Sequence, residues 1–253
     1  MNKLKIILIA VLLSPLFLYF INKPVDDGKV YELRVYHAHP GKLEDLQRRF
    51  RKHTTRIFEK HGMTNVGYWI PLENLDNKLI YILSYPSREA RENSWKAFGS
   101  DPEWQKVKSL SEANGKLVDK VESSFLKTTD FSPVIAPDSS KDPRVFELRT
   151  YITPSGRLND LLTRFRDYTM KLFSKHGMTN VGYWVPVEKE QGSENKLIYI
   201  LAHKSKEAGL KSWKAFGSDP EWQKVVKASE ANGRLAESIE SVYMTPTDYS
   251  PIK

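Results

Sequence analysis

The chain of 253 residues contains no cysteine. This absence excludes a disulfide framework, a thiolate zinc site and a cysteine nucleophile. The sequence also lacks a His-x-x-x-His or histidine–carboxylate spacing typical of metal sites, so we expect no metal and no other cofactor. It has no glycine-rich phosphate loop, no Ser–His–Asp arrangement and no paired catalytic carboxylates. The sequence therefore identifies no catalytic residue.

A continuous basic run is missing as well, although the formal net charge is +8. Positive and negative side chains alternate, as in LEDLQRRFRKH from Leu43 to His53. We therefore expect no nucleic-acid partner and interpret the charges as a solvated, mixed surface. Some preference for an anionic surface is the alternative.

Long hydrophobic runs are confined to the start of the chain. Ile6 to Ile21 is apolar and follows Lys3 and Lys5, which is the layout of an export signal. The run is short for a membrane span and long for a signal peptide, and no clear cleavage site follows it. Residues 1–22 are therefore either a cleaved signal peptide or a membrane anchor. Both predict a protein of the cell envelope, periplasmic or anchored with its domains outside the cytoplasm.

What the sequence does contain is a long internal repeat. HGMTNVGYW occurs at His61 to Trp69 and again at His176 to Trp184, and WKAFGSDPEWQKV begins at both Trp95 and Trp213. The second copy has three extra residues near Gln191 to Ser193. A period of this length is a whole domain. We therefore predict one domain over 30–133, a proline- and serine-rich linker over 134–144, and a second domain over 145–251.

Each repeat predicts the element order β-α-β-β-α-β. Alternation, helical spacing and turn residues place the elements of the first copy at Val30 to Tyr36, Gly41 to His61, Asn65 to Ile70, Leu79 to Tyr85, Arg88 to Lys120 and Val121 to Thr128. We expect the long second helix to break after Phe98-Gly99 and to restart at a capping box, SDPE. This order is that of a ferredoxin-like α+β unit, with both helices on one face of a four-stranded sheet.

The other face of such a sheet needs a cover. Because the chain holds two copies, we predict that the two sheets face each other and close an intramolecular barrel. The chain would then be a monomer.

The blocks YELRVY (copied as FELRTY), HGMTNVGYW and AFGSDPEW together resemble the NIPSNAP family, over Val30 to about Pro133 and Val145 to about Pro251. The resemblance implies the dimeric α+β barrel fold. The family has no settled enzymatic activity. Its animal members are mitochondrial and associate with membranes, vesicle traffic and mitophagy receptors. The leader of this chain differs from theirs, so those partners are not carried over.

Two arginines occupy matched positions in the first strand of each repeat. Arg34 lies between Glu32 and Tyr36, and Arg149 has the same neighbours, Glu147 and Tyr151. If Leu33 and Val35 pack on the helices, each polar trio points into the barrel. The arginine could then form a structural ion pair with the glutamate or hold an anionic ligand.

A matched aromatic pair, Tyr68-Trp69 and Tyr183-Trp184, lies on a later strand, so one member of each pair must face the barrel interior. We therefore expect a small-molecule pocket there. Its expected ligand-binding residues are Arg34, Tyr36, Tyr68, Trp69, Arg149, Tyr151, Tyr183 and Trp184.

The histidines are weaker candidates for functional residues. His61 and His176 each end a helix before glycine, where a histidine favours the helix dipole. His37, His39, His53 and His203 have no matched copy and look incidental. We therefore expect a non-enzymatic ligand-binding or interaction module. The alternative is a cofactor-independent monooxygenase or a heme-handling enzyme, as the barrel superfamily contains. A histidine inside the barrel would favour the enzyme, and an aliphatic interior would favour binding.

Overall fold

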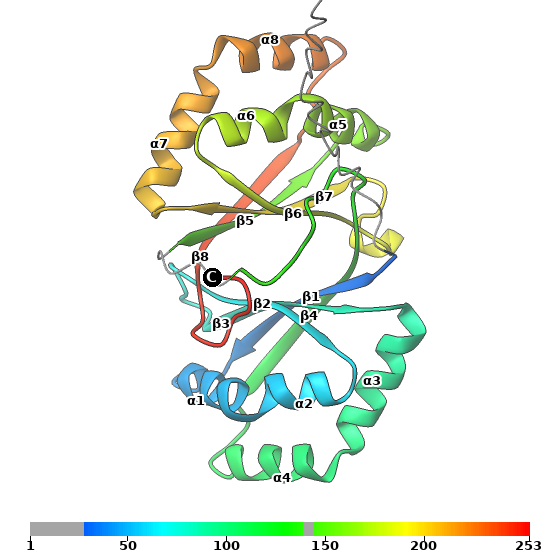
Figure 1. Cartoon of the computed structure of the whole chain (residues 1–253), viewed down its shortest axis with the longest axis vertical. Coiled ribbons are helices and arrows are strands. Elements are labelled where there is room, and N and C mark those ends of the chain that lie inside the picture. The colour runs from blue at the N-terminus through cyan, green and yellow to red at the C-terminus, as the bar shows by residue number, and fades with distance from the viewer. Residues whose placement is uncertain (1–27, 139–143) are drawn as a thin grey trace, which may run out of the picture.

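The computed structural model describes residues 28–138 and 144–253. The leader, residues 1–22, and part of the linker lie outside the described residues. In Figure 1 the strands of both repeats lie in the middle of the molecule, with helices α1 to α4 on one side and α5 to α8 on the other.

The two repeats have the same order of elements. Repeat 1 contains β1 Val30–Ala38, α1 Leu43–Arg49, α2 Thr55–Lys60, β2 Thr64–Pro71, β3 Lys78–Tyr85, α3 Arg88–Ser100, α4 Pro102–Ser111 and β4 Val118–Thr128. Repeat 2 contains β5 Val145–Ile152, α5 Leu158–Arg164, α6 Met170–Lys175, β6 Thr179–Pro186, β7 Lys196–His203, α7 Lys206–Gly217, α8 Pro220–Ser229 and β8 Ser238–Pro246. The predicted β-α-β-β-α-β order is confirmed.

The first helix of each repeat contains a π turn that the sequence spacing did not predict. In repeat 1 it spans Phe50–Thr54, between α1 and α2. The buried Thr54 hydroxyl donates to the carbonyl of Arg49 at 3.2 Å, which satisfies an oxygen in the widened turn. The helix then ends as expected before Gly62, whose φ of 77° suits glycine.

The break between α3 and α4 lies where the sequence predicted it, but the capping residue is different. Asp101, rather than Ser100, caps α4, and its Oδ1 accepts from the N–H of Glu103 at 2.8 Å. Ser100 instead ends α3, with its hydroxyl donating to the carbonyl of Lys96 at 3.0 Å. Asp101 lies one residue nearer to the first N–H groups of α4, so its carboxylate makes the cap directly.

The eight strands form a closed antiparallel barrel in the order β1-β3-β2-β8-β5-β7-β6-β4. Each repeat contributes four adjacent strands, and the repeats meet where β2 pairs with β8 and β4 pairs with β6. The α+β fold with an antiparallel barrel, predicted from the duplication, is thus present within one chain. Closure pairs the sheet edges that each repeat would otherwise expose.

Arms that follow the last strand of each repeat cross to the other repeat. Phe131, beyond β4, joins the core under the helices of repeat 2, with its ring 5.6 Å from that of Tyr183. Tyr249, beyond β8, packs in the same way in repeat 1, 5.3 Å from Tyr68. Because each arm packs on the other repeat, the core between sheet and helices in one repeat includes a side chain from the other.

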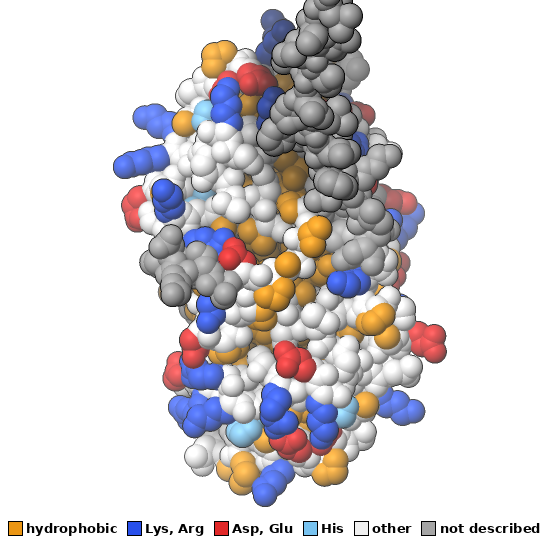
Figure 2. Space-filling model, viewed as in Figure 1, with side chains coloured by type: hydrophobic (Ala, Val, Ile, Leu, Met, Phe, Trp, Pro, Cys, Tyr) orange, Lys and Arg blue, Asp and Glu red, His pale blue; other side chains and the backbone are white. Residues whose placement is uncertain are grey.

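The surface carries charges of both signs. In Figure 2, Lys and Arg side chains are interspersed with Asp and Glu, while hydrophobic side chains gather across the middle, where the repeats meet. Over residues 28–138 and 144–253, no helix has the length and apolar character required to span a bilayer.

Candidate functional site

The first strand of each repeat presents the opposite face to that expected. Leu33 and Val35 pack against the core inside the barrel. Arg34 instead faces the helices, where its guanidinium lies 4.4 Å from the ring of Trp95 and its Nε donates to the hydroxyl of Tyr81 at 2.9 Å. Stacking on Trp95 gives the charge an aromatic partner on the helix side of the sheet. The expectation that the Arg34 trio points into the barrel was therefore wrong.

Repeat 2 has the same orientation. Arg149 stacks on Trp213 at 4.2 Å and donates to Glu147 at 2.5 Å. Arg34 likewise donates to Glu32. Of the two roles left open for these arginines, the geometry favours the structural ion pair, because each arginine binds the glutamate of its own strand while it stacks on a tryptophan of α3 or α7.

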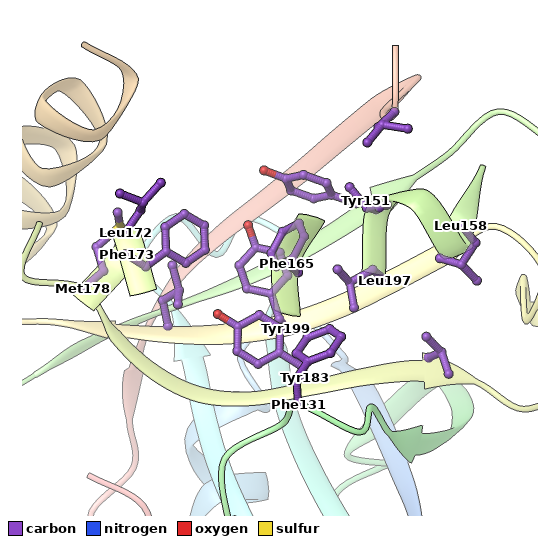
Figure 3. Close-up of a cluster of buried hydrophobic side chains, with 14 of the residues drawn as sticks. Phe131, Tyr151, Leu158, Phe165, Leu172, Phe173, Met178, Tyr183, Leu197 and Tyr199 are labelled. Atoms are coloured by element: carbon purple, nitrogen blue, oxygen red, sulfur yellow. The ribbon is translucent and has the colours of Figure 1, made fainter. Parts of the chain in front are cut away.

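The expected tyrosines also lie on the helix side. Figure 3 shows Tyr151 and Tyr183 near Phe165, among the side chains between the sheet and the helices of repeat 2. Tyr36 and Tyr68 occupy the matching cluster of repeat 1. Their predicted place in a barrel pocket is corrected, since strand alternation puts them opposite the residues that line the barrel.

Of the eight expected ligand-binding residues, Trp69 and Trp184 do face the barrel interior. Each indole folds back over a glycine two residues earlier, on the same face of its strand. A Cβ at Gly67 would lie 2.1 Å from the ring of Trp69, and one at Gly182 would lie 2.4 Å from Trp184. In the block VGYW, the glycine thus leaves the room that the tryptophan ring requires.

The indole N–H groups of Trp69 and Trp184 are buried and have no hydrogen-bond partner within the described part of the chain. Such groups usually find an acceptor. They add two donor groups to an otherwise apolar barrel core.

Beside this core the barrel has an open cavity of about 340 Å³. Aliphatic side chains from both repeats line it, with a matched leucine and isoleucine from each. They are Leu33, Val35, Ile80, Leu148, Ile198 and Val242. Thr150 replaces in repeat 2 the Val35 of repeat 1. The volume lies near the lower end of the range of about 300–1,000 Å³ for ligand pockets.

The rim of the cavity is polar and also follows the pseudo-twofold symmetry. Lys78 and Lys196 are matched lysines, and Glu122 and Glu240 are matched glutamates. Lys78 pairs with Asp76 at 2.8 Å. The cavity lining therefore combines aliphatic side chains with a larger number of polar ones, including charged groups of both signs.

A second cluster of interest surrounds Glu32, which is fully buried on the helix side of the sheet. Arg91 binds it through Nη2 at 2.8 Å, and Tyr85 donates to it at 2.9 Å. Burial raises the pKa of Glu32, but hydrogen bonds from Arg91 and Ser123 and the charge of Arg34 outweigh it. The pKa is lowered to about 2.

Repeat 2 departs from repeat 1 here. His203 takes the place of Tyr85, and Gly209 takes the place of Arg91. His203 is buried and its Nε2 lies 2.9 Å from the carboxylate of Glu147. Gly209 leaves room for this ring, because a Cβ at that position would lie 3.1 Å from the imidazole. Sequence reasoning treated His203 as incidental, although comparing the two copies residue by residue would have singled it out.

The matched histidines bridge two helices. His61 ends α2, and its Nε2 lies 2.6 Å from Oδ2 of Asp101, the cap of α4. Hydrogen bonds from Lys60 and His61 hold the pKa of Asp101 well below its ordinary value. His176 and Asp219 repeat the contact at 2.7 Å. This geometry supports a structural, helix-end role. Among the described residues no group of three or more histidines and carboxylates could hold a metal ion.

Comparison with known proteins agrees with the duplication. The NIPSNAP family model matches residues 31–133 and again residues 146–251. Protein NipSnap homolog 3A of Homo sapiens is 26% identical over 234 residues, covering 90% of this chain and 87% of the relative.

Two solved structures share the fold. A provisionally assigned monooxygenase from Lactobacillus acidophilus NCFM is 9% identical, with a TM-score of 0.54 over 87% of this chain and 94% of the other. An anthrone oxidase-like protein is 11% identical, with a TM-score of 0.57 over 90% and 95%. At these identities the likeness concerns the fold alone. The two matches of the family model span most of the sequence, and the chain belongs to the NIPSNAP family, with two copies of its domain.

Proposed function

We propose that the barrel binds a small, mainly apolar molecule with a polar end, and that the protein is a binding module without catalytic activity. The observation that carries the proposal is the cavity of about 340 Å³ lined by Leu33, Val35, Ile80 and their counterparts in repeat 2. A pocket whose aliphatic walls are combined with polar groups that can orient a ligand is a common form of ligand site.

The cavity favours binding over catalysis. Its described lining contains no histidine, and its carboxylates lie at the rim beside lysines. A general base must reach the proton that it removes, and Glu73, Asp76 and Glu122 of this lining are each paired with a lysine. The likeness to the provisionally assigned monooxygenase supports the enzyme alternative through fold only.

A cellular location at the envelope is part of the same proposal. Its support is the basic and apolar pattern of residues 1–22. Fractionation of cells that express the full chain tests it, with a cytoplasmic marker as the control. Recovery in the cytoplasmic fraction would contradict it.

The binding proposal is tested by native mass spectrometry of purified protein after incubation with a metabolite extract. We expect a bound small molecule whose retention is lost in Val35→Phe, because a phenyl ring there occupies part of the cavity. Val121→Phe is the matched control: Val121 pairs with Tyr36 across the strands and so faces away from the barrel.

Equal retention by Val35→Phe and the wild type would place the ligand elsewhere and overturn the proposal. Addition of heme distinguishes one form of the enzyme alternative. A Soret band that saturates at one heme per chain would favour heme handling, and a spectrum of free heme would oppose it.

A further inference from the structure

The two repeats differ in length at the hairpin turn, which spans residues 72–77 in repeat 1 and 187–195 in repeat 2. The longer turn forms a short 3-10 helix, Lys189–Gln191, followed by Gly192 with φ of 97°. Glycine adopts this left-handed conformation without steric cost. The additional residues carry Gln191 across to the sheet of repeat 1.

The Gln191 carboxamide binds the edge of β4. Its Oε1 accepts from the backbone N–H of Phe125 at 2.8 Å, and its Nε2 donates to the carbonyl of Ser123 at 3.2 Å. Residues two apart on a strand present their N–H and C=O on the same edge. A primary carboxamide carries one acceptor and a donor group, so it matches this pair as a neighbouring strand would.

The corresponding edge of β8, at Ser241 and Tyr243, has no such occupant. Leu72 donates its N–H to the carbonyl of Tyr243 at 2.8 Å, so this edge faces the shorter turn. Pairing of β8 with β2 ends at Met244. Within residues 28–138 and 144–253, no hydrogen bond reaches the N–H of Tyr243 or the carbonyl of Ser241 on this edge.

This edge lines a hollow of about 200 Å³, which we call the β8-edge pocket. It is lined by Leu72, Glu73, Lys206, Ser241, Val242 and Tyr243. Lys206 pairs with Glu73 at 2.7 Å and lies 5.7 Å from the centre of the Tyr243 ring.

The edge of β4 that Gln191 occupies has matching side chains around it. Arg88 pairs with Glu188 at 3.1 Å and lies over the ring of Phe125 at 3.3 Å. A cation, a glutamate and an aromatic ring therefore lie beside both strand edges. The two edges differ because a carboxamide, that of Gln191, occupies only the edge of β4.

We propose that the β8-edge pocket binds a primary carboxamide carried by a small molecule, held as Gln191 is held at β4. The N–H of Tyr243 donates to the amide oxygen, and the carbonyl of Ser241 accepts from the amide NH₂. A carboxylate offers no donor to Ser241, and Glu73 offsets the charge of Lys206 in the pocket, so the pocket selects the amide.

Amide NMR of the full chain, in detergent where residues 1–22 require it, tests the proposal with propionamide as the probe. We expect saturable shifts of the Tyr243 signal with Kd in the millimolar range, since about two hydrogen bonds carry the interaction. Sodium propionate, of the same shape, should leave that signal unchanged. Equal shifts with propionate, or a response to capped tetra-alanine but not to propionamide, would overturn the proposal.

Two variants test the proposal by comparing the β4 and β8 edges within the same protein. Gln191→Ala should free the β4 edge, so that the Phe125 signal then responds to propionamide as the Tyr243 signal does. Replacing residues 72–77 by the sequence of residues 187–195 should seat a glutamine at β8 and abolish the Tyr243 response. Failure of Phe125 to respond in Gln191→Ala would contradict the amide-matching argument even if the turn replacement does not fold.

Discussion

Tyr31 of repeat 1 packs edge-on against Trp184 of repeat 2, with ring centroids 5.9 Å apart and planes at 61°. The pseudo-symmetric contact joins Phe146 to Trp69 at 5.8 Å. Each contact crosses between repeats, and all four rings are buried. The interior of the barrel is therefore a core that neither repeat can complete alone.

Trp184→Ala should destabilise both repeats together. Removing a buried tryptophan costs about 3–5 kcal/mol, through lost burial and the cavity left behind. Because the core is shared, we expect one urea transition at a lower midpoint, with hydrogen exchange faster in β1 and β3 as well as in β6. Leu75→Ala, at a side chain that is 97% exposed, is the control. Retention of exchange protection in repeat 1 while repeat 2 unfolds would contradict a shared core.

Gly67→Ala should be destabilising although alanine suits a strand better than glycine does. The added Cβ would lie 2.1 Å from the Trp69 ring, so the indole must leave its position. Overpacking of this kind costs about 1–3 kcal/mol. The measurement is the free energy of unfolding from urea titration.

The reason for the Gly67 effect can be separated from a general effect of the substitution. In a Trp69→Phe background the smaller ring should leave room, so the cost of Gly67→Ala should fall. Gly99→Ala is the matched control in α3, where an added Cβ meets nothing within 4 Å. We expect that change to stabilise the helix by up to about 1 kcal/mol. An unchanged cost of Gly67→Ala in the Trp69→Phe background would disprove the steric explanation.

Acid should weaken the protein between pH 4.5 and pH 2. The pKa of Glu32 falls from 4.5 to about 2 on folding, and that of Glu147 falls in the same way. A depressed folded-state pKa contributes stability that is complete above the unfolded value and is lost as pH falls through the folded value. For Glu32 the contribution is about 3 kcal/mol.

Glu32→Gln isolates this effect. At pH 7 the variant should be less stable than the wild type, because Arg34 and Arg91 lose their carboxylate. The difference should shrink as pH falls from 4.5 to 2, when Glu32 itself becomes protonated. Urea titrations at several pH values provide the measurement. A difference that stays constant across this range would show that the carboxylate charge is not the stabilising group.

The fold could be predicted from the sequence because the duplication and the strand alternation act together. The repeat defines the domains, and alternation in VYELRVY shows a strand with two distinct faces. Alternation does not say which face meets the helices, since both faces of these strands are buried. The face was decided by the helices, where Trp95 and its copy Trp213 stack on Arg34 and Arg149. Strand alternation alone does not predict these contacts.

The candidate site was accessible from sequence only in part. Trp69 and Trp184 were expected at the barrel interior and lie there. The six aliphatic side chains that line the cavity beside them come from five strands, which no local motif brings together. Gln191 lies within the three-residue difference between the copies, but its contact with Phe125 depends on the closure of the barrel.

Closure of the barrel between the repeats underlies both the fold and the cavity, and expression of residues 30–133 alone tests this closure most directly. The fragment lacks the facing sheet and the Tyr249 arm that packs on its helix-side core. Sedimentation equilibrium should show a dimer or larger species, whereas residues 28–253 should sediment as one chain. A stable, soluble monomer of residues 30–133 would contradict the intramolecular barrel as the basis of folding and of the cavity.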